Sequence, residues 1–375
     1  MSLWNPANDG LLRALAEGAH AAGAAVLSQA THMGRRASSV ASGVPLQAPS
    51  AVAEAVHREV PGRLHATDID RIVACFAAAA VRLQACGWDG IEITSFGGHL
   101  IEQFWSPSVH RRTDRYRGSF ENRTRFAVEV LEAIGRAVRD DFLVSFRMTA
   151  DPATPELGLD PDDMPEIAAR LDRVGRVDRF DISGGTGATL LAQAGTVPPD
   201  HLPEKVYNPL ARAVREVVSA PVLVAGRILT PEAGEASLVA GDADLVAMTR
   251  AIIADPDLPA KTRRGERDRI RPCIAINESC IGRLYSGMPS AARSIRSCAT
   301  LDGCRLRRPI RAACWCRAGA RPGWRRPGWP RSAVIGSSSG SASESLAVRC
   351  AGRPGCPTDR AWGGTFPGSP ASFGA

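Results

Sequence analysis

A threonine and a histidine follow one of the apolar segments of the chain closely enough to form a small reactive site. Thr94 ends the run GIEIT, and His99 lies in the GGHL stretch that follows. A histidine with an unperturbed pKa of about 6.5 can donate a proton at neutral pH, and a threonine hydroxyl can supply one hydrogen bond. A lone histidine more often has a structural role, so both interpretations of His99 stay open at this stage.

Arg147 is a second candidate because it closes another apolar segment, residues 142–147. A cation at the C-terminal end of a strand lies where α/β folds bind their ligands. The alternative is a surface arginine that serves only in a salt bridge.

These residues must be positioned by the elements around them, and those elements alternate between β-type and helical patterns. Such an alternation is typical of parallel βαβ construction. Two connections, 33–66 and 94–118, are too long to be simple turns, and long ordered loops usually carry function. The predicted strands are 24–29, 90–93, 142–147, 179–182, 221–225 and 243–248. The predicted helices are 68–85 with Thr67 as N-cap, 121–138 behind Ser119, 161–174, 209–218, and 231–240 behind Thr230.

The charge of the chain is unevenly distributed. Of the formal net charge of +7, residues 289–375 contribute fourteen Arg and no Lys against three acidic residues, so the remainder of the chain is mildly acidic. No run reaches the roughly 18 apolar residues of a membrane span, and the N-terminus does not resemble a signal peptide. We therefore expect a cytoplasmic protein that binds neither a membrane nor, through residues 1–288, a nucleic acid.

Residues 289–375 form an arginine-, proline-, glycine- and tryptophan-rich tail without periodicity. A charged segment of this composition cannot bury enough apolar surface to offset its chain entropy, so we expect disorder. Abundant Arg without Lys is also typical of a GC-rich gene translated out of frame. Binding of single-stranded nucleic acid by the Arg and Trp side chains is the alternative interpretation.

Four segments together resemble one family. The segment at 89–126 contains DGIEI, HLIEQFWSP, RRTD, YRGS and ENRTRF, and three further matches are LSQATHMGRR at 27–36, VSFRMT at 144–149, and PVLVAGRI with DLVAMTRAIIADPDLP after residue 220. The chain thereby resembles old yellow enzyme, 2,4-dienoyl-CoA reductase and trimethylamine dehydrogenase. The resemblance implies an FMN-dependent (β/α)8 barrel that passes hydride from NAD(P)H through the flavin to a small organic substrate.

The resemblance also implies which residues hold the cofactor. Gln29 would reach the flavin from the end of its strand, and Arg147 would face the isoalloxazine ring and stabilise its anionic reduced form. In such barrels the loops after the last two strands bind phosphate. The residues at those positions are Gly226, Arg227, Thr249 and Arg250.

The same resemblance numbers the strands. If the last two are strands seven and eight, residues 24–29 are strand three, and residues 1–23 provide only a helix. We therefore expect an α/β TIM barrel that lacks its first two strands, with residues 1–288 as a partial FMN-binding unit. A barrel of this kind exposes two edge strands. An inactive remnant that retains no flavin is the alternative to an active enzyme.

The substrate site departs from the family pattern. Old yellow enzymes show two residues that hold a substrate carbonyl and a tyrosine that donates a proton, whereas this chain has Thr94, Gly97 and His99 at those places. The resemblance therefore implies a divergent substrate, with His99 and Thr94 as the candidate catalytic residues.

The segment RPCIAINESCIGRLYSGMP resembles the linker that binds a 4Fe-4S cluster in larger members of the family. Cys273 and Cys280 match two cluster positions, whereas Ile276 and Ala292 stand at the other two. Such a cluster needs four thiolates. We therefore expect neither a 4Fe-4S cluster nor another metal site, and the sequence leaves the oligomeric state undetermined.

Overall fold

The computed structural model describes residues 3, 5–56, 58–288, 314–316 and 334–337. All of them fall in one compact unit, Ser2–Ser339. In this part of the chain no helix is long and apolar enough to cross a membrane.

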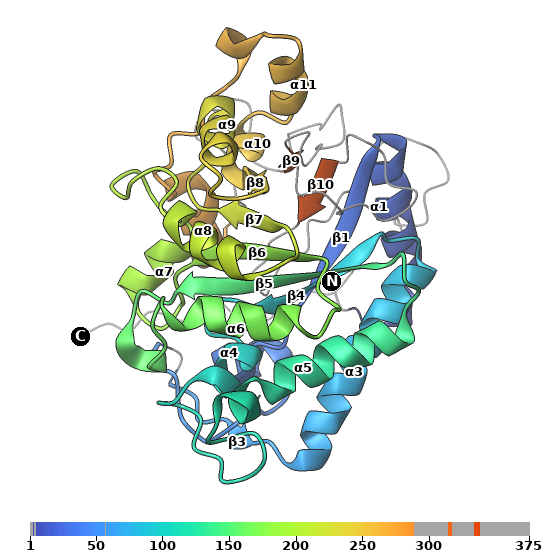
Figure 1. Ribbon diagram of the computed structural model, residues 1–375, viewed down its shortest axis with the longest axis vertical. Helices are drawn as coiled ribbons and strands as arrows, with labels where there is room; N and C mark the ends of the chain where they lie inside the picture. Colours follow the sequence, from blue (N-terminus) through green and yellow to red (C-terminus); the bar gives the residue numbers. More distant parts are fainter. Residues whose placement is uncertain (1–2, 4, 57, 289–313, 317–333, 338–375) are drawn as a thin grey trace, which may run out of the picture. The chain divides into compact units, whose positions relative to one another are not determined.

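Six parallel strands form a curled sheet in which each strand pairs with the next along the chain (Figure 1). All six strands predicted from the sequence are confirmed, in the predicted order. Because every step between them is a parallel crossover, a helix must return the chain between strands, and helices do so throughout. The strands are β1 (Ala24–Ala30), β4 (Gly90–Ser95), β5 (Leu143–Asp151), β6 (Arg179–Gly184), β7 (Val222–Ala225) and β8 (Leu245–Ala247).

The main helices match the predicted ones to within a few residues. Ser119 and Thr230 cap their helices as expected, because their hydroxyls accept the backbone N–H groups of Asn122 and Ala233. The prediction for Thr67 was wrong: the helix begins at Ala66, and Asp68 accepts the N–H of the capping residue His65 at 2.9 Å. These helices are α3 (Ala66–Ala85), α5 (Phe120–Ala137), α6 (Asp163–Asp172), α8 (Asn208–Val217) and α9 (Pro231–Val239).

The other elements lie at the ends of the unit and in the long connections. The remaining α-helices are α1 (Asp9–Ala21), α2 (Ser39–Ser42), α4 (Leu100–Trp105), α7 (Leu190–Thr196), α10 (Thr249–Ala254), α11 (Leu258–Arg263) and α12 (Arg283–Tyr285). The short turns of helix are η1 (Pro6–Asn8), η2 (Gly34–Arg36), η3 (Pro155–Leu157), η4 (Arg267–Arg269) and η5 (Glu278–Gly282), and β2 (Gln47–Ala48) pairs with β3 (Gly62–Arg63).

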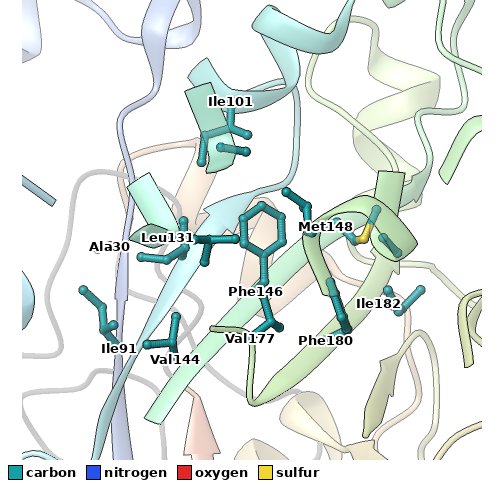
Figure 2. Close-up of a cluster of buried hydrophobic side chains, with 14 of the residues drawn as sticks. Ala30, Ile91, Ile101, Leu131, Val144, Phe146, Met148, Val177, Phe180 and Ile182 are labelled. Atoms are coloured by element: carbon teal, nitrogen blue, oxygen red, sulfur yellow. The ribbon is translucent and has the colours of Figure 1, made fainter. Parts of the chain in front are cut away.

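Apolar side chains at alternate strand positions form the main core, between the sheet and its helices. Phe146 of β5 lies among the side chains of neighbouring strands and helices, with Val144, Phe180 and Leu131 nearby (Figure 2). Alternate residues of a strand point to opposite faces. The residues between these apolar positions therefore face the concave side of the curled sheet.

The concave side changes from apolar to polar along the strands. Leu27, Leu143, Leu223 and Leu245 form a second, separate apolar cluster there. Beyond it, toward the C-terminal ends of β4, β5 and β6, the same face carries glutamate, serine, arginine and aspartate. A barrel interior is usually filled by branched apolar side chains, so these buried polar positions indicate a function.

Both edges of the six-stranded sheet are paired, in contrast to the bare edges expected from the sequence. The two strands responsible come from the tail: β10 (Val334–Ser337) lies parallel to β1, and β9 (Cys314–Cys316) lies antiparallel to β8. An edge strand offers unpaired N–H and C=O groups that accept such partners. The expected disorder of the tail stays a prediction, and most of the tail lies outside the described part of the chain.

Candidate functional site

The register of the strands aligns the polar residues on the concave face of the sheet in two rows. Gln29, Glu92, Ser145 and Arg179 are successive Cα partners across β1, β4, β5 and β6, and we name them the lower row. Thr94, Arg147 and Asp181 are partners in the same way two residues further along, and we name them the upper row. The sequence therefore places seven polar side chains in the interior by strand alternation alone.

The lower row is a closed hydrogen-bonded network around Glu92. Its Oε1 accepts the amide Nε2 of Gln29 at 2.9 Å, and its Oε2 accepts Nη2 of Arg179 at 2.8 Å and the hydroxyl of Ser145 at 2.9 Å. Burial alone would raise the pKa of Glu92, but Arg179, Arg147 and these hydrogen bonds outweigh it and hold the pKa below its ordinary value. Glu92 is therefore an ionised carboxylate at neutral pH.

Arg147 dominates the upper row. Its guanidinium lies 4.4 Å from the centre of the Phe96 ring, and its Nη2 donates to the Ser183 hydroxyl at 3.3 Å. Its Nε lies 4.0 Å from an oxygen of Asp181 and makes no hydrogen bond within the described residues. Burial raises the pKa of Asp181. The arrangement leaves a buried cation with a spare donor in the middle of β5, on the concave face of the sheet.

His99 is the N-cap residue immediately before α4, and its side chain is nine-tenths buried. Its Nδ1 lies 2.8 Å from the Thr31 hydroxyl. Burial, and then the nearby charges of Arg36 and Arg147, lower the pKa of His99 to about 3. The ordinary pKa assumed from the sequence therefore does not hold, and the ring is neutral at neutral pH.

The loop before His99 is held by a glutamate that the sequence analysis did not single out. The fully buried carboxylate of Glu102 accepts the N–H of Gly98, and Thr149 accepts the N–H of Gly97 at 3.0 Å. Burial raises the pKa of Glu102 to about 7. A Cβ on Gly97 would lie 3.8 Å from Nε2 of His99, so the glycine leaves that edge of the ring open.

Thr94 lies next to Arg147 across the β4–β5 ladder. Its hydroxyl is buried and has no hydrogen-bond partner within the described residues. A buried polar group of this kind calls for an explanation, and a ligand in the site is one.

The two predicted phosphate loops follow β7 and β8 as expected. Arg227 has a left-handed backbone (φ 54°), its Nη1 donates to the carbonyl of Leu202, and its buried Nε has no partner in the described part of the chain. Gly226 has a packing role, because a Cβ there would lie 2.6 Å from the ring of Tyr207. Thr249 is exposed at the start of α10.

Arg250 is the other cation of these loops. It donates to the side-chain oxygen of Asn277 at 2.8 Å and to the carbonyl of Pro198 at 2.7 Å. Burial lowers its pKa, and no carboxylate among the described residues pairs with it. Arg227 and Arg250 are therefore two partly desolvated cations at neighbouring strand ends that make hydrogen bonds only to neutral oxygens.

Cys273 and Cys280 are both partly exposed, and the thiol of Cys280 faces the carbonyl of Asn277 at 3.7 Å. The described residues contain no group of three potential metal ligands. Ala292 lies outside the described part of the chain, so the expected absence of an iron–sulfur cluster stays a prediction.

Residues 1–269 match the model of the NADH:flavin oxidoreductase / NADH oxidase family. The chain is 42% identical over 275 residues to N,N-dimethylglycine/sarcosine dehydrogenase of Chromohalobacter salexigens, a match that covers 73% of this chain and 39% of that protein. It is 40% identical over 269 residues to the multifunctional alkene reductase/demethylase OYE of Caballeronia cordobensis, a match that covers 71% of this chain and 39% of that protein. The chain spans about two fifths of the length of these relatives.

Solved structures are similar over the same region. A 2-naphthoyl-CoA reductase complex superposes with a TM-score of 0.71 at 27% identity, covering 77% of this chain and 45% of that one. Histamine dehydrogenase from Rhizobium sp. 4-9 superposes with a TM-score of 0.69 at 28% identity, covering 77% of this chain and 41% of that one. Morphinone reductase in complex with tetrahydroNAD superposes with a TM-score of 0.56 at 27% identity, covering 70% of this chain and 72% of that one.

Proposed function

The chain belongs to the NADH:flavin oxidoreductase / NADH oxidase family, and on this premise we propose that it is an FMN-dependent oxidoreductase. In this proposal it carries hydride from NAD(P)H to a small organic substrate, and residues 1–288 are the unit that binds the flavin. Bound FMN supplies the ring that accepts and releases hydride.

The residues at the C-terminal ends of the strands fit FMN. Arg147 has a buried Nε without a hydrogen bond, and Arg227 has another, each within the described residues. A flavin needs a cation near its pyrimidine ring and donors around its phosphate. Arg147 with Gln29 would hold the ring, and Arg227 and Arg250 would hold the phosphate together with Gly226 and Thr249.

The observation that carries the proposal is the pair Arg227 and Arg250. Two partly desolvated guanidinium groups at adjacent strand ends, hydrogen-bonded only to neutral oxygens, repel each other unless an anion joins them. A phosphate provides two charges and several acceptor oxygens at that place.

The test is to titrate the purified protein with FMN and with riboflavin, which lacks the phosphate, and to follow quenching of the flavin fluorescence. Arg250→Met is expected to weaken FMN binding by about tenfold or more and to leave riboflavin binding unchanged. Arg136→Met, which removes an exposed arginine on α5, is the matched control. Absence of FMN binding by the unaltered chain, the behaviour of an inactive remnant, would contradict the proposal.

A more specific candidate is the oxidation of a small secondary or tertiary amine. Alkene reduction needs a proton donor, whereas His99 is held neutral by burial. A neutral imidazole can instead accept a hydrogen bond from a substrate N–H, and the buried hydroxyl of Thr94, near the end of β4, has no partner in the described part of the chain. The names of two similar proteins, N,N-dimethylglycine/sarcosine dehydrogenase and dimethylamine dehydrogenase, are in line with this.

The two substrate classes are separated by an anaerobic mixing experiment on the FMN-loaded protein. An amine substrate such as sarcosine is expected to bleach the visible flavin absorbance without added NAD(P)H. Bleaching by NAD(P)H that is reversed by an enone, with no response to amines, would instead support alkene reduction and refute amine oxidation.

A further inference from the structure

The orientation of the Gln29 amide is determined by the charge of its neighbour. Glu92 is fully buried and ionised, so both of its oxygens are acceptors only. The contact at 2.9 Å must therefore be made by the amide NH2 of Gln29. The amide oxygen of Gln29 does not take part in this contact, and no described residue donates a hydrogen bond to it.

Glu92 is itself held in place by the rest of the lower row. Arg179 donates its Nε to the Ser145 hydroxyl at 3.1 Å and its Nη2 to Glu92 at 2.8 Å. Because Ser145 accepts from Arg179, its single proton goes to Glu92, at 2.9 Å. The hydrogen bonds thus run from Arg179 through Ser145 to Glu92, and occupy the carboxylate oxygen that Gln29 does not use.

We propose that Glu92 and Arg179 are positioning residues that make Gln29 an obligate hydrogen-bond acceptor toward the flavin. The inference rests on the proposed FMN function. An oxidised isoalloxazine ring carries a single N–H group, on its pyrimidine part, and the free amide oxygen of Gln29 is complementary to that group. A neutral residue at position 92 would let the Gln29 amide turn over and present its NH2 instead.

A double-mutant cycle on the whole chain tests the inference, with the FMN dissociation constant as the readout. Glu92→Gln and Gln29→Ala are each expected to weaken FMN binding by about tenfold, the effect of one buried hydrogen bond. In the double variant the sum of the two losses should not be reached, because Glu92 acts on the flavin through Gln29 as well as through the charge of Arg147. Glu235→Gln, which alters an exposed carboxyl on α9, is the control and should leave FMN binding unchanged in either background.

Glu92→Gln leaves Arg179 buried without a counter-charge and could therefore unfold the chain. A second variant avoids this problem. The pair Glu92→Gln with Arg179→Met removes both charges together and should weaken FMN binding to the same extent as Glu92→Gln. Near-ultraviolet circular dichroism confirms folding before each titration.

The outcomes separate this inference from the proposed function. If the unaltered chain binds no FMN, both are overturned. If it binds FMN but the Glu92→Gln loss persists in full in the Gln29→Ala background, Glu92 has a merely structural role and only the positioning inference falls.

Discussion

Glu102→Gln tests the electrostatics of the loop that carries His99. Glu102 has no exposed surface, so solvent does not screen its charge, and burial is the main cause of its raised pKa of about 7. In the unfolded chain the same carboxyl has its ordinary value of 4.5. Between these two values the folded protein holds a proton that the unfolded chain has released.

The direction and size of the pH effect on stability follow from the difference between the folded and unfolded pKa values of Glu102. The free energy of unfolding of the unaltered protein should fall as the pH rises through this window, because folding then requires the carboxyl to take up a proton. A shift of roughly 2.5 pKa units corresponds to about 3 kcal/mol. Glutamine does not titrate, so the variant lacks this contribution at every pH.

The assay is urea unfolding of both proteins at intervals between about pH 5 and pH 8, with the difference in the free energy of unfolding as the measured quantity. Other groups that titrate in this range, Asp181 among them, cancel in that difference. The stability of the unaltered protein relative to Glu102→Gln should fall by about 2.5 kcal/mol between about pH 5 and pH 8. Glu235→Gln, which alters an exposed carboxyl on α9, is the matched control. A difference for Glu102→Gln that stays constant across this range would refute the reasoning.

Three further predictions concern the core, a helix cap and the protonation of the site. Phe146→Ala removes a fully buried ring between β5 and the helices and should lower the free energy of unfolding by about 3–5 kcal/mol in urea titrations; a loss below about 1 kcal/mol would contradict the described core. Ser119→Ala should cost about 1 kcal/mol by the same measurement, because the N–H of Asn122 loses its acceptor, whereas Ser119→Asp should retain the cap. The His99 ring should show no titration by NMR between about pH 5 and pH 8, since its pKa is lowered to about 3; a midpoint near neutrality would show that the site is wetter than the structure indicates.

The order of the strands and the place of the cofactor loops could be predicted from the sequence. Apolar runs separated by helical periods specify parallel βαβ units, and each run ends where its loop begins. The family resemblance placed Arg227 and Arg250 after the last two strands, and the structure has them there, whereas Arg147, predicted at the end of its strand, lies in the middle of β5. The hydroxyls of Ser119 and Thr230 were likewise recognisable as caps, because capping involves only residues a few positions apart.

The tertiary structure decided what the polar side chains do once they are enclosed. Glu92, Ser145, Arg147, Arg179 and Asp181 alternate with apolar residues in their strands, a pattern visible in the sequence, but their pairing depends on register between strands that are far apart in the chain. Burial lowers the pKa of His99 and raises that of Glu102, and desolvation is a property of the surroundings that no single segment contains. The sequence by itself therefore determined which residues share one face of each strand, and only the fold decided which of them meet and which of them carry charge there.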